Sequence, residues 1–167
     1  MFHILVVEDD RALRELFCTV LSKNGFVYHE ARDGVEAWDV LEKQYIDLIV
    51  TDIMMPNMNG FEFIKSLRQN GLNLPVLVIT AKDAFEDMQS GFLAGTDDYM
   101  VKPVNVNEMI LRLNALLKRA QIVNEKKIRF ENAELRYDDL TVCIAGDCSV
   151  LPQKEFYILY KLLSNPN

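Results

Sequence analysis

The chain alternates between short apolar runs and longer stretches in which apolar residues recur every three or four positions. The short runs predict five strands, at 3–7, 27–31, 47–51, 75–80 and 98–101. The helical spacing predicts a helix after each strand, at 11–24, 35–44, 61–68, 85–94 (the weakest pattern) and 105–120. Five β-then-α units indicate a doubly wound α/β domain, with helices on both faces of a parallel sheet.

Polar side chains follow four of these strands at the point where each strand ends. Glu8 and Asp9 follow the first strand and Asp52 follows the third, while Thr80 ends the fourth and Lys102 follows the fifth. The carboxyl ends of parallel strands meet at one edge of the sheet, where open α/β domains bind their ligands. Clustered carboxylates need a cation to offset their repulsion, and carboxylate oxygens suit Mg²⁺. We therefore predict a magnesium site with a lysine beside it.

Four stretches carry a resemblance to a known family. LVVEDD (5–10), TDIMMPNMNG (51–60), VIT (78–80) and GTDDYMVKP (95–103), in this order and spacing, resemble the receiver domain of two-component response regulators. The resemblance covers residues 1–120 and implies a five-stranded, flavodoxin- or CheY-like sheet of order 2-1-3-4-5. It also implies a cytoplasmic signalling switch, which accepts a phosphoryl group from a sensor histidine kinase and is not a turnover enzyme.

The resemblance assigns a role to each residue of the predicted site. Asp52 would be the phosphoacceptor, and Thr80 and Lys102 would bind the phosphoryl oxygens. Tyr99 would change rotamer as the readout, and the bond before Pro103 would be cis. The magnesium ligands would be Glu8, Asp9, Asp52 and the backbone carbonyl of Met54.

Several of these residues also have a simpler interpretation. Asp10 directly precedes a helix, so we expect it to be an N-cap and not a metal ligand. Thr80 would also suit an ordinary strand position, and Tyr99 would also suit simple packing. Met54, Met55 and Met58 are soft ligands that do not fit an oxygen-rich site, so we expect them to pack. We assign His3 and His29 to structural roles and Trp38 to the core.

Residues 128–167 resemble the beginning of an OmpR/PhoB-type winged-helix output domain, after a linker at 121–127. Short strands with turns at Asn132, 138–139 and 146–147 lead to a helix with Pro152 in its first turn. The recognition helix and the wing would follow Asn167, so we expect a truncated form that does not bind promoter DNA specifically. The helix face with Phe156, Leu159 and Leu163 would then have lost packing surface.

The resemblance further implies a homodimer formed through the fourth helix, the fifth strand and the fifth helix. Residues that match this surface are Asp97, Asp98, Glu108, Arg112 and Arg119. Ser90 stands where the family usually has a basic residue, which would remove an ion pair with Glu108 and weaken the dimer. A second departure is Val104, where the family often has Phe.

Net charge, hydrophobicity and cysteine content limit the classes of protein to which the chain can belong. The net charge is −7, which argues against nonspecific binding to nucleic acid. The sequence contains no run of about 18 apolar residues, so we expect no membrane span. Cys143 and Cys148 would face each other across a tight turn at IAGD. With Cys18, however, the cysteines are few and odd in number, and we expect free thiols in a reducing compartment.

Two other functions share part of this chemistry. A hydrolase of the haloacid-dehalogenase type also uses a strand-end Asp, Mg²⁺ and a Lys. It needs a second Asp two residues after the nucleophile as general acid, and Met54 occupies that position. The other alternative is a receiver that is regulated without phosphorylation.

Overall fold

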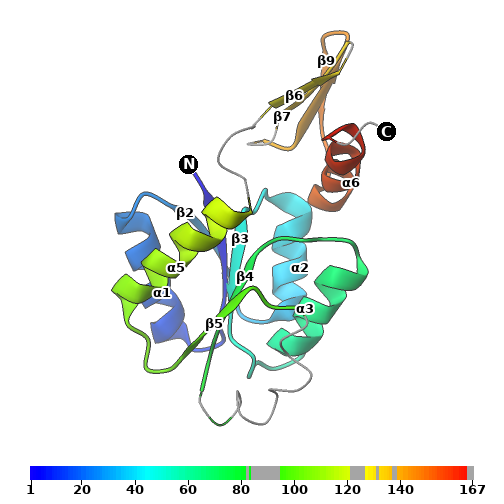
Figure 1. Ribbon diagram of the computed structural model, residues 1–167. Helices are drawn as coiled ribbons and strands as arrows, with labels where there is room; N and C mark the ends of the chain where they lie inside the picture. Colours follow the sequence, from blue (N-terminus) through cyan, green and yellow to red (C-terminus); the bar gives the residue numbers. More distant parts are fainter. Residues whose placement is uncertain (82, 84–94, 121–126, 131, 137–138, 165–167) are drawn as a thin grey trace.

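The computed structural model describes residues 1–81, 83, 95–120, 127–130, 132–136 and 139–164. Within them, the first 120 residues form a five-stranded parallel sheet of order β2-β1-β3-β4-β5 (Figure 1). The strands are β1 (His3–Val7), β2 (Val27–Ala31), β3 (Leu48–Thr51), β4 (Val76–Thr80) and β5 (Asp98–Val101). This confirms the strand order that the resemblance implied. The helix predicted at 85–94, together with Ser90, lies outside the described residues.

Helices cover both faces of the sheet (Figure 1). They are α1 (Arg11–Lys23), α2 (Gly34–Lys43), α3 (Gly60–Gln69) and α5 (Val106–Arg119). Each begins after a residue whose side chain accepts hydrogen bonds from the first-turn amides, namely Asp10, Asp33, Asn59 and Asn105. Asp10 is therefore an N-cap, as predicted: its Oδ1 accepts from the amide of Leu13 at 2.8 Å.

Alternate residues of the central strands point into two separate cores. Leu5 and Val7 of β1 pack with α2 and α3, whereas Ile4 and Val6 pack with α1 and α5. All four side chains are at most 1% exposed. The near-continuous apolar run in β1 is thus explained by burial on both faces, which parallel sheets require.

The described residues between 127 and 164 form a smaller antiparallel sheet and a helix, which lie beyond the end of α2 (Figure 1). The strands are β6 (Lys127–Phe130), β7 (Ala133–Arg136), β8 (Thr141–Ile144) and β9 (Asp147–Val150), paired in that order, followed by α6 (Gln153–Ser164). The β8–β9 turn is formed by Ala145 and Gly146, both with positive φ, so Asp147 belongs to the strand and not to the turn.

The small sheet and α6 enclose their own core, to which Tyr45 of the larger domain also belongs. Phe156 is fully buried with Leu140 and Val142, and Tyr45 from the loop before β3 joins this cluster. The prediction that the face with Phe156 had lost its packing surface was therefore wrong for this residue. Its ring is fully buried within the chain, on the sheet that precedes α6.

Polar contacts of Gln153 and Lys154 connect α6 to the larger domain. The buried side chain of Gln153 donates a hydrogen bond to the carbonyl oxygen of Ile46 at 3.1 Å. The ammonium group of Lys154 donates to Oδ1 of Asn70 at 2.8 Å. These contacts lie near the amino ends of the strands, and the polar residues at the strand ends lie at the opposite edge of the sheet.

The two histidines stack on each other, with 5.3 Å between ring centroids. Nδ1 of His3 lies 3.1 Å from Nε2 of His29 on the neighbouring strand, where the register pairs His3 with Val27 and Leu5 with His29. Of the helices in the described part of the chain, none has both the length and the apolar character needed to cross a bilayer.

Candidate functional site

The parallel sheet brings together the residues that follow or end four of its strands. Glu8 and Asp9 follow β1, Asp52 follows β3, Thr80 ends β4 and Lys102 follows β5. Because β1, β3, β4 and β5 run parallel, their carboxyl ends lie at one edge. The sequence predicted this set, and side-chain contacts join Glu8, Asp52 and Lys102 directly.

Lys102 bridges two carboxylates from different strands. Its ammonium group lies 2.7 Å from Oδ2 of Asp52 and 3.1 Å from Oε2 of Glu8. Burial alone would lower the pKa of Lys102, but hydrogen bonds and opposite charge from Asp52 and Glu8 raise it above its usual value. The lysine is therefore a fixed positive charge in the site.

Glu8 is held in a buried position at the end of β1. Its side chain is 2% exposed, and burial raises its pKa to about 6. The charge of Asp52 adds to this rise, whereas the amide of Asp10 and the charge of Lys102 oppose it. On the outer side, Arg14 donates to the backbone carbonyl of Glu8 at 2.7 Å and so fixes the strand end.

The two carboxylate oxygens of Asp52 have different environments. Oδ1 accepts hydrogen bonds from the backbone amides of Ile53 and Met54, at 2.6 and 3.3 Å, while Oδ2 faces Lys102. Asp52 itself is only 5% exposed. Oδ2 is therefore the oxygen that the fold presents next to a cation, in a fixed orientation.

Gly60, at the start of α3, allows the backbone to approach Asp52 closely. A Cβ atom at this position would lie 2.0 Å from the carbonyl oxygen of Asp52, so no other residue fits without a backbone shift. The amide of Gly60 donates to the carbonyl of Ile53 at 2.9 Å, which closes the loop between β3 and α3. This close approach explains why glycine occupies the last position of the MNG sequence.

Three acids are close enough to share a cation. Glu8, Asp9 and Asp52 each offer a carboxylate oxygen, and these oxygens lie within 4.8 Å of one another. Glu8 and Asp52 are buried, whereas Asp9 is exposed. Carboxylate oxygens on a partly open edge are the donor set that suits Mg²⁺.

Thr80 and Tyr99 lie on neighbouring strands, with different exposure. Thr80 is fully buried, and within the described residues its hydroxyl oxygen has no hydrogen-bond partner. Buried polar groups are almost always paired, so this hydroxyl is available for a bound group. Tyr99 is 38% exposed, and the Lys102–Pro103 peptide bond, where the resemblance predicts a cis bond, is cis.

A side-chain clamp beside the site was not anticipated from the sequence. Nδ2 of Asn57 donates to Oδ2 of Asp33 at 2.6 Å, and the amide of Gly34 donates to the carbonyl of Met58 at 3.2 Å. These contacts tie the loop that carries Met54 to the start of α2. Asn57 has a φ of 62°, a left-handed conformation that Asn tolerates better than most residues. The motif contains this Asn, but its partner could not be deduced from local sequence.

Two of the three methionines of this loop pack, as expected from their chemistry, and the third faces solvent. Met55 is buried in the core between the sheet, α2 and α3, and Met58 packs against it. Met54 is 60% exposed, so the expectation that it packs was wrong for this residue. Trp38 is partly buried against the same core, with its ring edge-on to Phe63.

The acidic and basic residues expected at a dimer surface form contacts within the chain. Arg112 lies 2.9 Å from Asp98 and 2.8 Å from Glu108. Asp97 accepts instead from Arg68 of α3 at 3.1 Å and from the amide of Val76 at 2.8 Å. Arg119 is exposed in the last turn of α5.

Comparison with known proteins decides the family. The model of the response regulator receiver domain matches residues 4–114. The chain belongs to the response regulator receiver family. The heme response regulator HssR of Staphylococcus epidermidis is 35% identical over 166 residues, which cover 99% of this chain and 74% of that protein. Response regulator MprA of Mycobacterium tuberculosis is 39% identical over 171 residues, covering 98% and 73%.

A solved receiver domain has the same fold as the first part of this chain. It belongs to a sensor histidine kinase of Pseudomonas aeruginosa PAO1, and a magnesium ion is coordinated in its active site cleft. It shares 27% identity with a TM-score of 0.64, and the match covers 70% of this chain and 98% of that domain. The receiver fold therefore accounts for the five-stranded sheet, and the antiparallel sheet with α6 lies outside it.

Proposed function

We propose that this receiver is a phosphorylation-dependent switch in which Asp52 is the phosphoacceptor. The observation that carries the proposal is the asymmetry of this carboxylate: backbone amides hold Oδ1, and Oδ2 faces Lys102 at 2.7 Å. A buried, oriented carboxylate beside a cation is suited to attack phosphorus, because charge that develops on the phosphoryl oxygens is stabilised in place.

The donor set fits the magnesium ion that receivers are expected to bind. Glu8, Asp9 and Asp52 would hold it, with the backbone carbonyl of Met54 as a further ligand. The bound ion would supply positive charge that screens the carboxylates from an incoming phosphoryl group. The comparable site in the Pseudomonas receiver holds magnesium in its cleft, which supports the same ion here.

The residues of this chain then divide the work of phosphoryl transfer. Oδ2 of Asp52 attacks phosphorus, a P–O bond forms, and the bond from phosphorus to the donor nitrogen of a phosphohistidine breaks. Lys102 pairs with the phosphoryl oxygens and exchanges its contact with the free carboxylate for one with the product. The hydroxyl of Thr80, which has no partner among the described residues, donates to a phosphoryl oxygen, and Tyr99 on the neighbouring strand reports the change by its rotamer.

The type of regulator suggests the phosphoryl donor and the process that the switch controls. We infer that a sensor histidine kinase donates the phosphoryl group. Residues 1–120 would be the receiver and 121–127 the linker, and the antiparallel sheet with α6 would begin a winged-helix output domain. The homodimer would form through α5, β5 and the fourth helix, which is predicted at 85–94. Exposed ion pairs would contribute about 0–1 kcal/mol each. Promoter DNA would be the partner of a regulator with a complete output domain, and transcription its readout.

Mass spectrometry of the intact protein tests this proposal. Incubation with acetyl phosphate and Mg²⁺ should add one phosphoryl group to the wild type, and light scattering should then detect the dimer. Asp52→Asn and a sample with chelator serve as controls, and neither should gain mass. If the wild type gains no mass even with a sensor kinase, the receiver is regulated without phosphorylation. Phosphoryl uptake by a protein that stays monomeric would contradict the dimer alone.

A further inference from the structure

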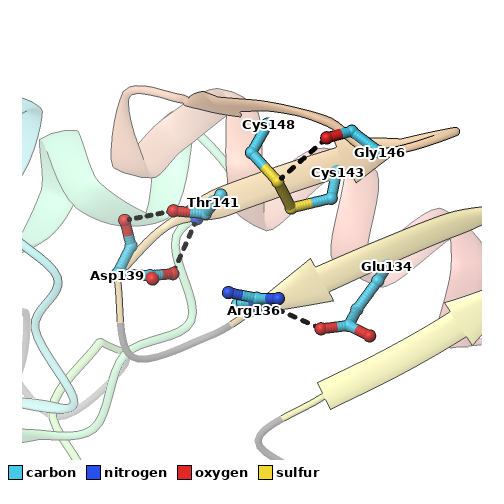
Figure 2. Close-up of a disulfide and its surroundings, with 7 residues drawn as sticks. All are labelled: Glu134, Arg136, Asp139, Thr141, Cys143, Gly146 and Cys148. Atoms are coloured by element: carbon cyan, nitrogen blue, oxygen red, sulfur yellow. Dashed lines mark hydrogen bonds and ion pairs between the residues drawn. A yellow bond between two sulfur atoms is a disulfide. The ribbon is translucent and has the colours of Figure 1, made fainter.

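The β8–β9 hairpin places two cysteines directly opposite each other. The turn residues Ala145 and Gly146 adopt left-handed φ values of 52° and 98°, so Ile144 pairs with Asp147 and Cys143 with Cys148. The two Cα atoms are 4.0 Å apart, and the sulfur atoms are bonded (Figure 2). The expectation of free thiols is therefore wrong for this pair, because the register of the hairpin juxtaposes the two side chains.

The two sulfur atoms differ in their access to solvent. Cys148 lies on β9, which in the described sheet pairs only with β8, and its residue is exposed. Cys143 is 8% exposed, and Sγ of Cys148 lies 4.0 Å from the carbonyl oxygen of Gly146. A small thiol or disulfide in solution can thus reach Cys148 first, with Cys143 behind it as the resolving group.

Cys18 provides an internal contrast. It is buried in α1, and burial raises the pKa of its thiol to about 11. Its thiolate fraction at neutral pH is accordingly small, and thiolates are the species that react. Of the three cysteines, only the hairpin pair combines proximity with access.

We propose that Cys143 and Cys148 are a redox-responsive thiol pair that exchanges with a small disulfide of the glutathione type. The Cys148 thiolate attacks one sulfur of the small disulfide and releases one small thiol. The Cys143 thiolate then attacks Sγ of Cys148 and releases the second. The protein pair loses two electrons and two protons, and the small disulfide is reduced to two thiols that take up the protons.

The position of the pair gives this reaction a structural consequence. β9 leads directly into α6: the amide of Leu151 donates to the carbonyl of Leu140 at 2.9 Å, and Gln153 then reaches the carbonyl of Ile46 in the receiver. The disulfide adds a covalent link between β8 and β9 just before these contacts. In the reduced form, backbone hydrogen bonds to β8 alone hold β9 in the described sheet, so this strand should open more often.

Thiol alkylation and mass spectrometry in glutathione redox buffers test the exchange. In the native wild type, both hairpin thiols should disappear together as the buffer becomes more oxidising, and Cys18 should stay unmodified throughout. Cys18→Ser, the matched control, should show the same transition. Cys143→Ser should instead accumulate one glutathione adduct, on Cys148. Two alkylatable hairpin thiols in fully oxidising buffer, or adducts on the wild type without an internal disulfide, would overturn the proposal.

Hydrogen exchange tests the coupling to α6 separately. Amides of β9 and the first turn of α6 should exchange about tenfold faster in the reduced wild type than in the oxidised one. Amides of β1 and β3 should exchange equally in both forms. Cys148→Ser should behave as the reduced protein in either buffer. Equal rates in β9 for the two forms would overturn the proposed coupling, independently of phosphorylation at Asp52.

Discussion

The ammonium group of Lys102 lies 2.7 Å from Oδ2 of Asp52, and this single contact joins the ends of β5 and β3. The same group reaches Glu8 on β1 at 3.1 Å. One cation thus balances two buried carboxylates that would otherwise repel each other. The contact explains how the fold tolerates an acidic site at the end of a buried strand.

Removal of this cation should destabilise the protein. Lys102→Met leaves Glu8 and Asp52 buried without their partner, and breaking a largely buried ion pair costs about 3–5 kcal/mol, reduced here to about 2 because Lys102 is 26% exposed. Urea unfolding at pH 7 in chelator measures the change. Lys118→Met, at an exposed site on α5, should have little effect. An equal effect of the two substitutions would contradict the balancing role of Lys102.

Gly60→Ala should disturb both the fold and the site. The new Cβ would lie 2.0 Å from the carbonyl oxygen of Asp52, so the loop must shift, at a cost of about 1–3 kcal/mol or more. Phosphoryl uptake at Asp52 should fall with it, because the shift moves the backbone of the acceptor. Gly71→Ala is the matched control. Gly71 has a φ of 75°, and apart from its chain neighbours nothing lies within 4 Å of a Cβ added there, so the variant should lower stability without slowing uptake. Normal uptake by Gly60→Ala would contradict this role.

The pKa of Glu8 predicts how stability depends on pH in the absence of metal. The folded protein binds the Glu8 proton more tightly than the unfolded chain, with a pKa of about 6 against the usual 4.5. The free energy of unfolding should therefore fall by about 2 kcal/mol as pH rises through this window, relative to Glu8→Gln. Urea unfolding of both proteins in chelator at several pH values measures the difference. Parallel pH profiles for the two proteins would exclude a raised pKa.

The clamp between Asp33 and Asn57 should position the loop that carries Met54. Asn57→Gly keeps the left-handed backbone, and Asp33→Ser keeps an N-cap for α2, but each removes the side-chain hydrogen bond. A double-mutant cycle should give a coupling free energy of about 1–2 kcal/mol. The Mg²⁺ concentration that half-saturates phosphoryl uptake should rise in either single variant and not rise further in the double variant. Additive effects would show that the two residues act independently.

The sequence predicted best those features that a short local pattern of residues determines. The apolar run at 4–7 predicts a strand buried on both faces, and Asp10 predicts an N-cap. In both cases the signal lies in adjacent residues of the sequence. The strand-end acids could be assembled into one site because parallel strands share an edge. These rules use direction and periodicity and need no long-range contacts.

The remaining features depend on register and on docking, which local sequence does not specify. The Cys143–Cys148 pair requires the turn to fall on Ala145 and Gly146, and a shift by one residue would separate the two sulfur atoms. The hydrogen bond from Gln153 to Ile46 joins residues 107 positions apart. Asp33 and Asn57 are 24 positions apart, and their contact depends on how α2 packs beside the loop after β3.

The most direct measurement is the location of the phosphoryl group on the chain. The wild type is phosphorylated with acetyl phosphate and Mg²⁺ and then treated with borohydride, which reduces an acyl phosphate to an alcohol, and peptide mass spectrometry finds the altered residue. The predicted result is reduction at Asp52 alone, absent from a sample without Mg²⁺. Reduction at Glu8 or Asp9 with Asp52 intact would contradict the assignment of Asp52 as the phosphoacceptor.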